Sequence, residues 1–296
     1  QRATVAWHNA LLSWGRFLLA FGMILWLGAS SAVAMMGYAC ATLVVLVSQL
    51  WFFRRTIRPS EIAAEADDEG VRQWNRRMSD YAWPFATFGV FTFAQMASDR
   101  WALEAFATTR EVGLYTVLCQ LGYYPITILT TLLVQLVSPI FFQRAGDGSD
   151  ASRVRQVHRV NQWLTFAVLL LTGLAVLLAF GVHGLVFRWL VAPEYRPVSW
   201  LLPWMVLAGG LFATGQFASL SLMSGNRSAT LIGPKVVTAI VGVGMNLIGA
   251  RFYGAQGVVA ASILFSAFYC LWIYCLLHFC RSSGLLDIAS DEVECK

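Results

Sequence analysis

The sequence predicts an all-α protein: a polytopic integral membrane bundle of about eight transmembrane helices. Of its 296 residues, 58% are hydrophobic and 12% are charged, and the mean hydropathy is +0.62. A soluble domain carries about twice this share of charged residues. The apolar residues gather in segments of about 20, the length that a helix needs to cross the hydrocarbon core of a bilayer.

The apolar segments predict the helices in order. We expect spans at about 11–27, 32–53, 81–98, 112–142, 160–187, 199–223, 229–250 and 257–279. The links at 54–80, 143–159 and 224–228 are richer in arginine than the other links, and such links stay in the cytoplasm. Trp83 and Trp101 are among several tryptophans near predicted span ends, which is typical of the aromatic belts at membrane interfaces.

Cysteine labelling tests this topology. A Ser149→Cys variant should react only with a maleimide that crosses the membrane, because we place its link in the cytoplasm. The unaltered protein, with its own cysteines, sets the background. Strong labelling of intact cells by an impermeant maleimide would reverse the predicted orientation.

Charge, cysteines and motifs exclude several classes of protein. The net charge is +5, but the basic residues lie in links between spans, where they set topology, so we expect no nucleic-acid partner. The six cysteines form no Cys-x-x-Cys pair and the four histidines are scattered, so we expect no metal site and no cofactor. The GxSxG, HExxH, P-loop and Rossmann motifs are absent, so we expect no enzyme.

One predicted helix carries polar side chains through its whole apolar length. They are Gln120, Tyr124, Thr127, Thr131, Gln135 and Ser138, at intervals of four, three, four, four and three. At about 100° per residue these side chains share one arc of the helix. We call them the polar row. Facing lipid, each unpaired group would cost roughly 1–3 kcal/mol. We expect the row to line a cavity, and a dry seam between helices is the alternative.

The residues around Asp99 have two interpretations. Asp99 and Arg100 lie at the outer end of their span, close to Glu104 and Arg110. One interpretation is a cluster of ion pairs that holds the outer ends of helices together. The other is that Asp99 is a coupling or gating carboxylate, since it shares a helix face with Gln95.

Two more cations lie within predicted spans. Lys235 shares a helix face with Asn246 and with small residues, a pattern that either packs helices closely or lines a wet path. Lys235 either extends to the cytoplasmic surface or faces inward, where it would attract the phosphates of a lipid-linked substrate. Arg16, about one turn from the start of its span, either extends to the headgroups or faces a cavity.

The order and spacing of several motifs resemble a known family. An Asp-Arg pair at 99–100 closes one span, and Val-Gly-Leu-Tyr at 112–115 opens the next. Pro-Glu-Tyr-Arg-Pro at 193–197, Leu-Leu-Pro at 201–203 and Tyr-Gly-Ala-Gln-Gly-Val-Val-Ala-Ala-Ser at 253–262 follow. This arrangement resembles the carboxy-terminal part of the bacterial polysaccharide and O-antigen lipid flippases, which are related to the multidrug and toxin extrusion transporters.

The resemblance implies two six-helix lobes. Residues 1–53 would be the last two helices of the amino-terminal lobe, 54–80 the cytoplasmic link, 81–280 the carboxy-terminal lobe and 281–296 a cytoplasmic tail. The chain starts at Gln1, not at Met, so we expect that it lacks the beginning of the whole protein.

The resemblance also implies a function. Such a flippase moves a polyprenyl-diphosphate-linked oligosaccharide across the bacterial inner membrane by alternating access. Its partners would be the lipid bilayer and a polysaccharide polymerase or export machinery. The substrate path would be lined by Gln95, Asp99, Arg100, Gln120, Tyr124, Thr127, Thr131, Gln135, Lys235 and Asn246. The main alternative is an ion-coupled multidrug or metabolite exporter of the same fold, and a membrane enzyme acting on lipid-linked sugars is a third class.

Overall fold

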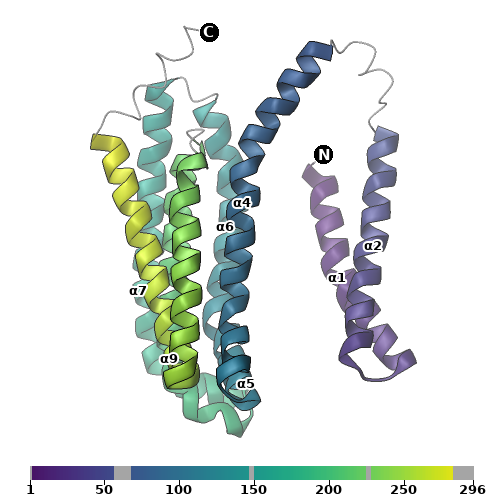
Figure 1. Cartoon of the computed structure of the whole chain (residues 1–296), viewed down its shortest axis with the longest axis vertical. Coiled ribbons are helices and arrows are strands. Elements are labelled where there is room, and N and C mark those ends of the chain that lie inside the picture. Colours follow the sequence, from purple (N-terminus) through teal and green to yellow (C-terminus); the bar gives the residue numbers. More distant parts are fainter. Residues whose placement is uncertain (1, 57–67, 147–149, 225–227, 283–296) are drawn as a thin grey trace. The chain divides into compact units, whose positions relative to one another are not determined.

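Helices account for all the regular structure in the part of the chain that can be described. The computed structural model describes residues 2–56, 68–146, 150–224 and 228–282. Every regular element in these ranges is a helix (Figure 1), so the predicted all-α fold is confirmed. The chain forms two compact units, Gln1–Arg76 and Arg77–Lys296.

The first unit is built on a helical hairpin. α1 (Arg2–Leu27) and α2 (Ser31–Thr56) are joined by a turn at Gly28, whose φ of +96° suits glycine. Gly37 on α2 lies directly against the backbone of Ala20 on α1, where a larger side chain would not fit. Small residues therefore let the two helices approach closely, as in other membrane helix pairs.

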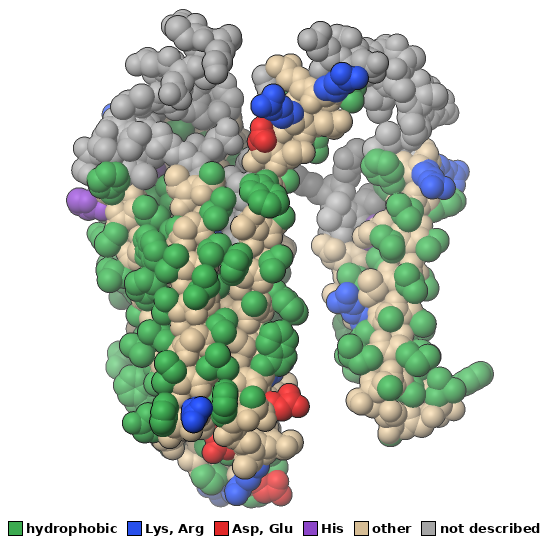
Figure 2. Space-filling view, viewed as in Figure 1, with side chains coloured by type: hydrophobic (Ala, Val, Ile, Leu, Met, Phe, Trp, Pro, Cys, Tyr) green, Lys and Arg blue, Asp and Glu red, His purple; other side chains and the backbone are tan. Residues whose placement is uncertain are grey.

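The second unit is a bundle around one central helix. Its elements are α4 (Asp68–Phe106, which begins before the boundary between the units), α5 (Thr109–Leu118), η1 (Cys119–Tyr123), α6 (Tyr124–Ala145), α7 (Ala151–Leu190), η2 (Pro193–Leu201), α8 (Leu202–Ser224), η3 (Ser228–Leu231) and α9 (Ile232–Ser282). α8 packs against α6, α7 and α9, and most of its side chains are buried. Figure 2 shows hydrophobic side chains over the flanks of this unit and charged ones toward its ends, as expected for helices that contact lipid.

The structure supports a multi-pass membrane protein. Among the described residues, six stretches of helix are long and apolar enough to cross a bilayer: Trp7–Leu27, Ser31–Arg55, Thr109–Ala145, Ser152–Leu190, Pro193–Ser224 and Ala229–Phe279. The count differs from the eight expected spans for two reasons. α4 is not among the six, because aromatic and polar residues lower the hydropathy of its segment 81–98. The last stretch, within α9, joins the two spans expected at 229–250 and 257–279.

The chain reverses direction inside α9. Gly254 has φ +55° and ψ −137°, far from helical values. Gly249, before the turn, lies against Gly257, after it. The two arms of α9, 232–253 and 255–282, therefore run side by side in opposite directions, and they are green and yellow in Figure 1. The turn expected between the last two spans is present.

Helices extend into segments that we expected to be polar links. α7 begins at Ala151, so the second half of the expected loop 143–159 is helical. α4 already begins at Asp68 and continues to Phe106, so the end of one expected link and the start of another are helical too. Hydropathy locates the lipid-facing part of a helix and not the end of its hydrogen bonding, since polar residues also form helices in water.

The start of α7 has a well-formed cap. The Asp150 carboxylate accepts hydrogen bonds from the backbone N–H groups of Ser152 and Arg153, at 2.9 and 3.3 Å. The Ser152 hydroxyl also donates to it, at 2.6 Å. These bonds, with the Ser152 hydroxyl first, lower the pKa of Asp150 below its usual value. They satisfy backbone donors that the helix leaves free at its first turn.

A wide helical turn precedes α6. Pro125 has no backbone N–H, and its ring clashes with the carbonyl four residues earlier in a regular helix. The preceding turn, η1, is a π-helix in which the Tyr124 N–H donates to the Cys119 carbonyl. Such π-turns are frequent at functional sites.

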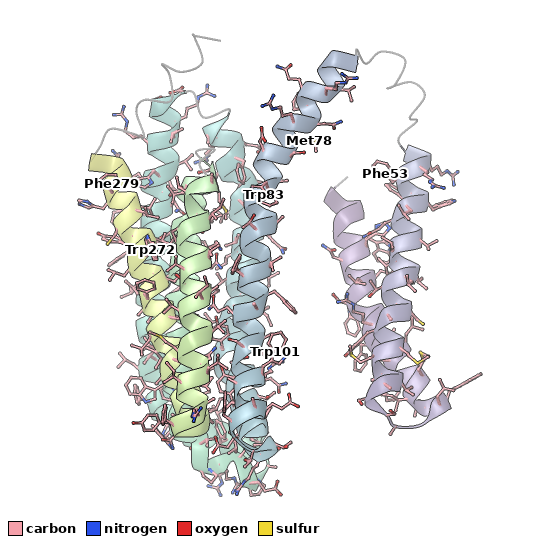
Figure 3. The ribbon with its side chains drawn as sticks, in the orientation of Figure 1. Phe53, Met78, Trp83, Trp101, Trp272 and Phe279 are labelled. Atoms are coloured by element: carbon pink, nitrogen blue, oxygen red, sulfur yellow. The ribbon has the colours of Figure 1, made fainter. Side chains whose placement is uncertain are left out.

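Two large aromatic side chains lie near helix ends in the second unit. Trp101 lies near the end of α4 and Phe279 near the end of the second arm of α9, whereas Trp83 lies near the middle of α4 (Figure 3). All three are exposed. This placement is typical of side chains at the membrane interface.

Candidate functional site

A carboxylate is held between α4, α5 and α9. The Tyr115 hydroxyl donates to Asp99 Oδ2 at 2.9 Å and lies 3.4 Å from Ser262 Oγ. The Arg100 backbone N–H donates to Asp99 Oδ1 at 2.7 Å. These hydrogen bonds hold the Asp99 carboxylate in place.

A second set of bonds joins α4 to the first arm of α9. Asn246 Nδ2 donates to Ser98 Oγ at 2.9 Å, and Ser98 Oγ donates to the Gln95 carbonyl at 2.7 Å. We call the six residues Gln95, Ser98, Asp99, Tyr115, Asn246 and Ser262 the Asp99 cluster. Five of them, all except Ser98, line a cavity of about 30 Å³. A cavity of this size has room for one or two water molecules.

The ion-pair interpretation of this region is not supported. Asp99 forms no salt bridge within the described ranges, and neither Glu104 nor Arg110 bonds to it there. The reason is geometric, because α4 remains helical beyond Asp99 and places Glu104 about 140° around the helix axis. Glu111 instead accepts a hydrogen bond of 2.6 Å from the Ala255 N–H and so ties α5 to the turn of α9.

Arg100 connects α4 to the polar row. Its guanidinium donates a hydrogen bond to the Tyr124 hydroxyl and lies 5.9 Å from the centre of that ring. The Nε atom of Arg100 is buried and has no hydrogen-bond partner among the described residues. A half-buried guanidinium whose buried Nε–H has no partner among the described residues favours a site for a polar or anionic group.

Lys235 lies inside the second unit. Its ammonium donates to Gln216 Oε1 at 3.1 Å and lies 5.5 Å from the centre of the Tyr269 ring. The side chain is 8% exposed, so it does not extend to the membrane surface as one interpretation had it. A small cavity of about 10 Å³ lies beside it. Gln95 lines this cavity as well as the one beside Asp99, so this residue lies next to both cavities.

The polar row lies at the surface of the second unit. Gln120, Thr131 and Gln135 are exposed, and Tyr124, Thr127 and Ser138 are half-buried. Thr127 and Thr131 donate to backbone carbonyls of their own helix, at 3.0 and 2.7 Å, and therefore need no other partner. The amides of Gln120 and Gln135 form no hydrogen bond with the described residues. The cost of facing lipid therefore falls mainly on these two amides.

Arg16 in the first unit lies farther from the helix end than we expected. The apolar stretch is Trp7–Leu27, because α1 begins earlier than the predicted span, and Arg16 is near its middle. Its Nε donates to Thr42 Oγ1 at 3.3 Å. A groove of about 480 Å³, which Ser13 and Tyr38 also line, lies beside it. An arginine at this depth favours a functional role over extension to the headgroups.

The sequence did not single out several members of this site. Tyr115 and Ser262 end two of the motifs that carry the family resemblance, but their hydrogen-bond partners are far away in the sequence. Gln216 and Tyr269 are polar residues in apolar helices, and this is the one signal that could have found them.

Neither a metal site nor a known relative defines the site. Across the described ranges, no three side chains of His, Cys, Asp or Glu converge as a metal site requires. No protein-family model, curated protein or solved structure matches this chain. The function is therefore inferred from the chemistry of the groups above.

Proposed function

We propose that this protein moves a polyprenyl-diphosphate-linked oligosaccharide across the bacterial inner membrane by alternating access. The observation that carries the proposal is the polar edge of η1 and α6, where the exposed amides of Gln120 and Gln135 flank Tyr124 and its partner Arg100. Facing lipid, these unpaired amides would be unfavourable. Facing a water-filled path, they have partners in water and in the hydroxyls of a sugar, while the guanidinium attracts a diphosphate.

The balance of charge supports an anionic substrate. In the second unit, Arg100 and Lys235 lie within or beside the apolar helices, and Asp99 is the acidic group among them. Cations inside a membrane are costly and are typical of substrate or ion paths. Two cations against one carboxylate favour a diphosphate over a cationic drug.

Expression in a bacterium that lacks its own O-antigen flippase tests the proposal. We expect the protein that carries both lobes to restore surface polysaccharide and to lower the lipid-linked oligosaccharide accumulated in the cell, relative to an empty vector. Protection against cationic dyes without restored polysaccharide would support the drug exporter instead. If neither effect is seen although the membrane holds normal amounts of the protein, both functions are excluded.

Within this proposal, Asp99 is the coupling carboxylate. It lies beside a cavity with room for water, and hydrogen bonds from Tyr115 and the Arg100 backbone hold it there. Asp99→Asn should leave the protein folded, because asparagine keeps an acceptor for Tyr115. It should also remove the response of transport to an ion gradient. If transport by the Asp99→Asn variant still follows the ion gradient, Asp99 is not the coupling carboxylate.

A further inference from the structure

A large groove lies on a part of the second unit that the proposed transport path does not use. Its volume is about 560 Å³, within the range typical of small-molecule sites. Its walls are α7 and the second arm of α9, and α8 lies between them with the small side chains of Thr214, Ala218 and Ser221. None of its lining residues belongs to α4, η1 or α6, which carry Asp99 and the polar row.

The lining changes from polar to apolar along the groove. Asn161, Gln162 and His278 line one end, and Leu169 and Leu211 line the other. His278 lies next to the end of the last apolar stretch, which closes at Phe279, so the polar end is at the membrane surface. This gradient matches an amphipathic molecule that enters with its tail first.

The length of the groove matches one leaflet of the bilayer. α7 rises by about 12 Å between Asn161 and Leu169, and α9 rises by about 16 Å between Ala267 and His278. Half of the hydrocarbon core is about 15 Å. The groove therefore extends from the surface to near the middle of the membrane, which is the depth of one acyl chain.

Basic side chains surround the polar end. Arg155 is exposed on α7, two turns before Gln162 and so on the same helix face. His158 lies between them and is hydrogen bonded to Gln162 Nε2, at 2.9 Å. The surroundings favour a negatively charged headgroup.

We propose that this groove binds one acyl chain of an anionic phospholipid, whose phosphate lies beside Arg155 and His278. The lipid is a resident component of the second unit and is separate from the transported molecule, because the groove shares no residue with the polar row or the Asp99 cluster. The inference goes beyond the proposed function and does not depend on it.

Native mass spectrometry of the purified protein with added lipid tests this site. We expect one phosphatidylglycerol per chain and much weaker retention of phosphatidylcholine. Ala267→Leu, which fills the groove, should lower the retention about tenfold. The matched control is Ala167→Leu, an exposed α7 position outside the groove, which should leave retention unchanged. Arg155→Gln should lower the preference for phosphatidylglycerol about fivefold.

Thermal unfolding without added lipid shows whether each variant folds. Leu271→Trp, at an exposed lining position, replaces Ala267→Leu if the latter does not fold. Equal retention of both phospholipids, or full retention in the folded groove variants, would overturn the proposal. So would displacement of phosphatidylglycerol by an equimolar amount of polyprenyl phosphate, since the groove would then belong to the transported lipid.

Discussion

Gly254→Ala should destabilise the second unit by about 3 kcal/mol or more. Gly254 adopts φ +55° and ψ −137°, a conformation that is strained for any residue with a side chain. A Cβ at this position would also overlap the carboxylate of Glu111. That carboxylate accepts the hydrogen bond from the Ala255 N–H. One methyl group would therefore strain the turn of α9 and break its link to α5.

Gly244→Ala is the matched control for this prediction. Gly244 lies in the first arm of the same helix, and nothing comes within 4 Å of an added Cβ. Alanine should be neutral there or stabilise by up to about 1 kcal/mol. Thermal unfolding in detergent, with the monodisperse fraction after size exclusion, measures both variants. Equal melting temperatures for Gly254→Ala and the unaltered protein would contradict the hairpin in α9.

Replacing both Gln120 and Gln135 by leucine should lower export about tenfold and leave the fold intact. Both side chains are exposed and form no hydrogen bond with the described residues, so their loss removes no internal contact. In a substrate path, however, two amides that bind water or sugar hydroxyls would be lost. The measurement is surface polysaccharide per unit of membrane protein.

The matched control for the double variant is Gln256→Leu. This amide is exposed beside the turn of α9, away from the polar row, and the change in chemistry is the same. Export should remain normal in this control. Normal export from the double variant would show that the polar row does not line the substrate path. Loss of the protein itself would indicate a structural seam between helices instead.

The fold class was predictable because composition and the length of apolar runs report directly on a lipid environment. The turn at Gly254 was predictable too, since polar and glycine residues interrupt the apolar run there. The ends of the helices were not predictable. α7 begins at Ala151 behind the Asp150 cap, in a segment where hydropathy favours a loop. Capping and backbone hydrogen bonds decide such ends, and hydropathy does not measure them.

Individual residues of the candidate site were predictable, but their grouping was not. Gln95, Asp99 and Asn246 stood out as polar groups in apolar helices. Their association with Tyr115 and Ser262 depends on how α5 packs against α9, across 147 positions of sequence. The spacing of residues within one helix carries no information on such contacts. The depth of Arg16 was missed for another reason, because the apolar stretch of α1 begins at Trp7, before the span predicted at 11–27.

Reconstitution into vesicles tests the central claim most directly. The purified protein is placed in liposomes that contain a fluorescent polyprenyl-diphosphate-linked oligosaccharide in both leaflets, and an impermeant reductant is added outside. If the protein moves this lipid, more than the outer half of the fluorescence should be lost, while a fluorescent phosphatidylcholine should lose only the outer half. Loss of only half in both cases, or equal further loss of both lipids, would contradict selective translocation of the lipid-linked oligosaccharide.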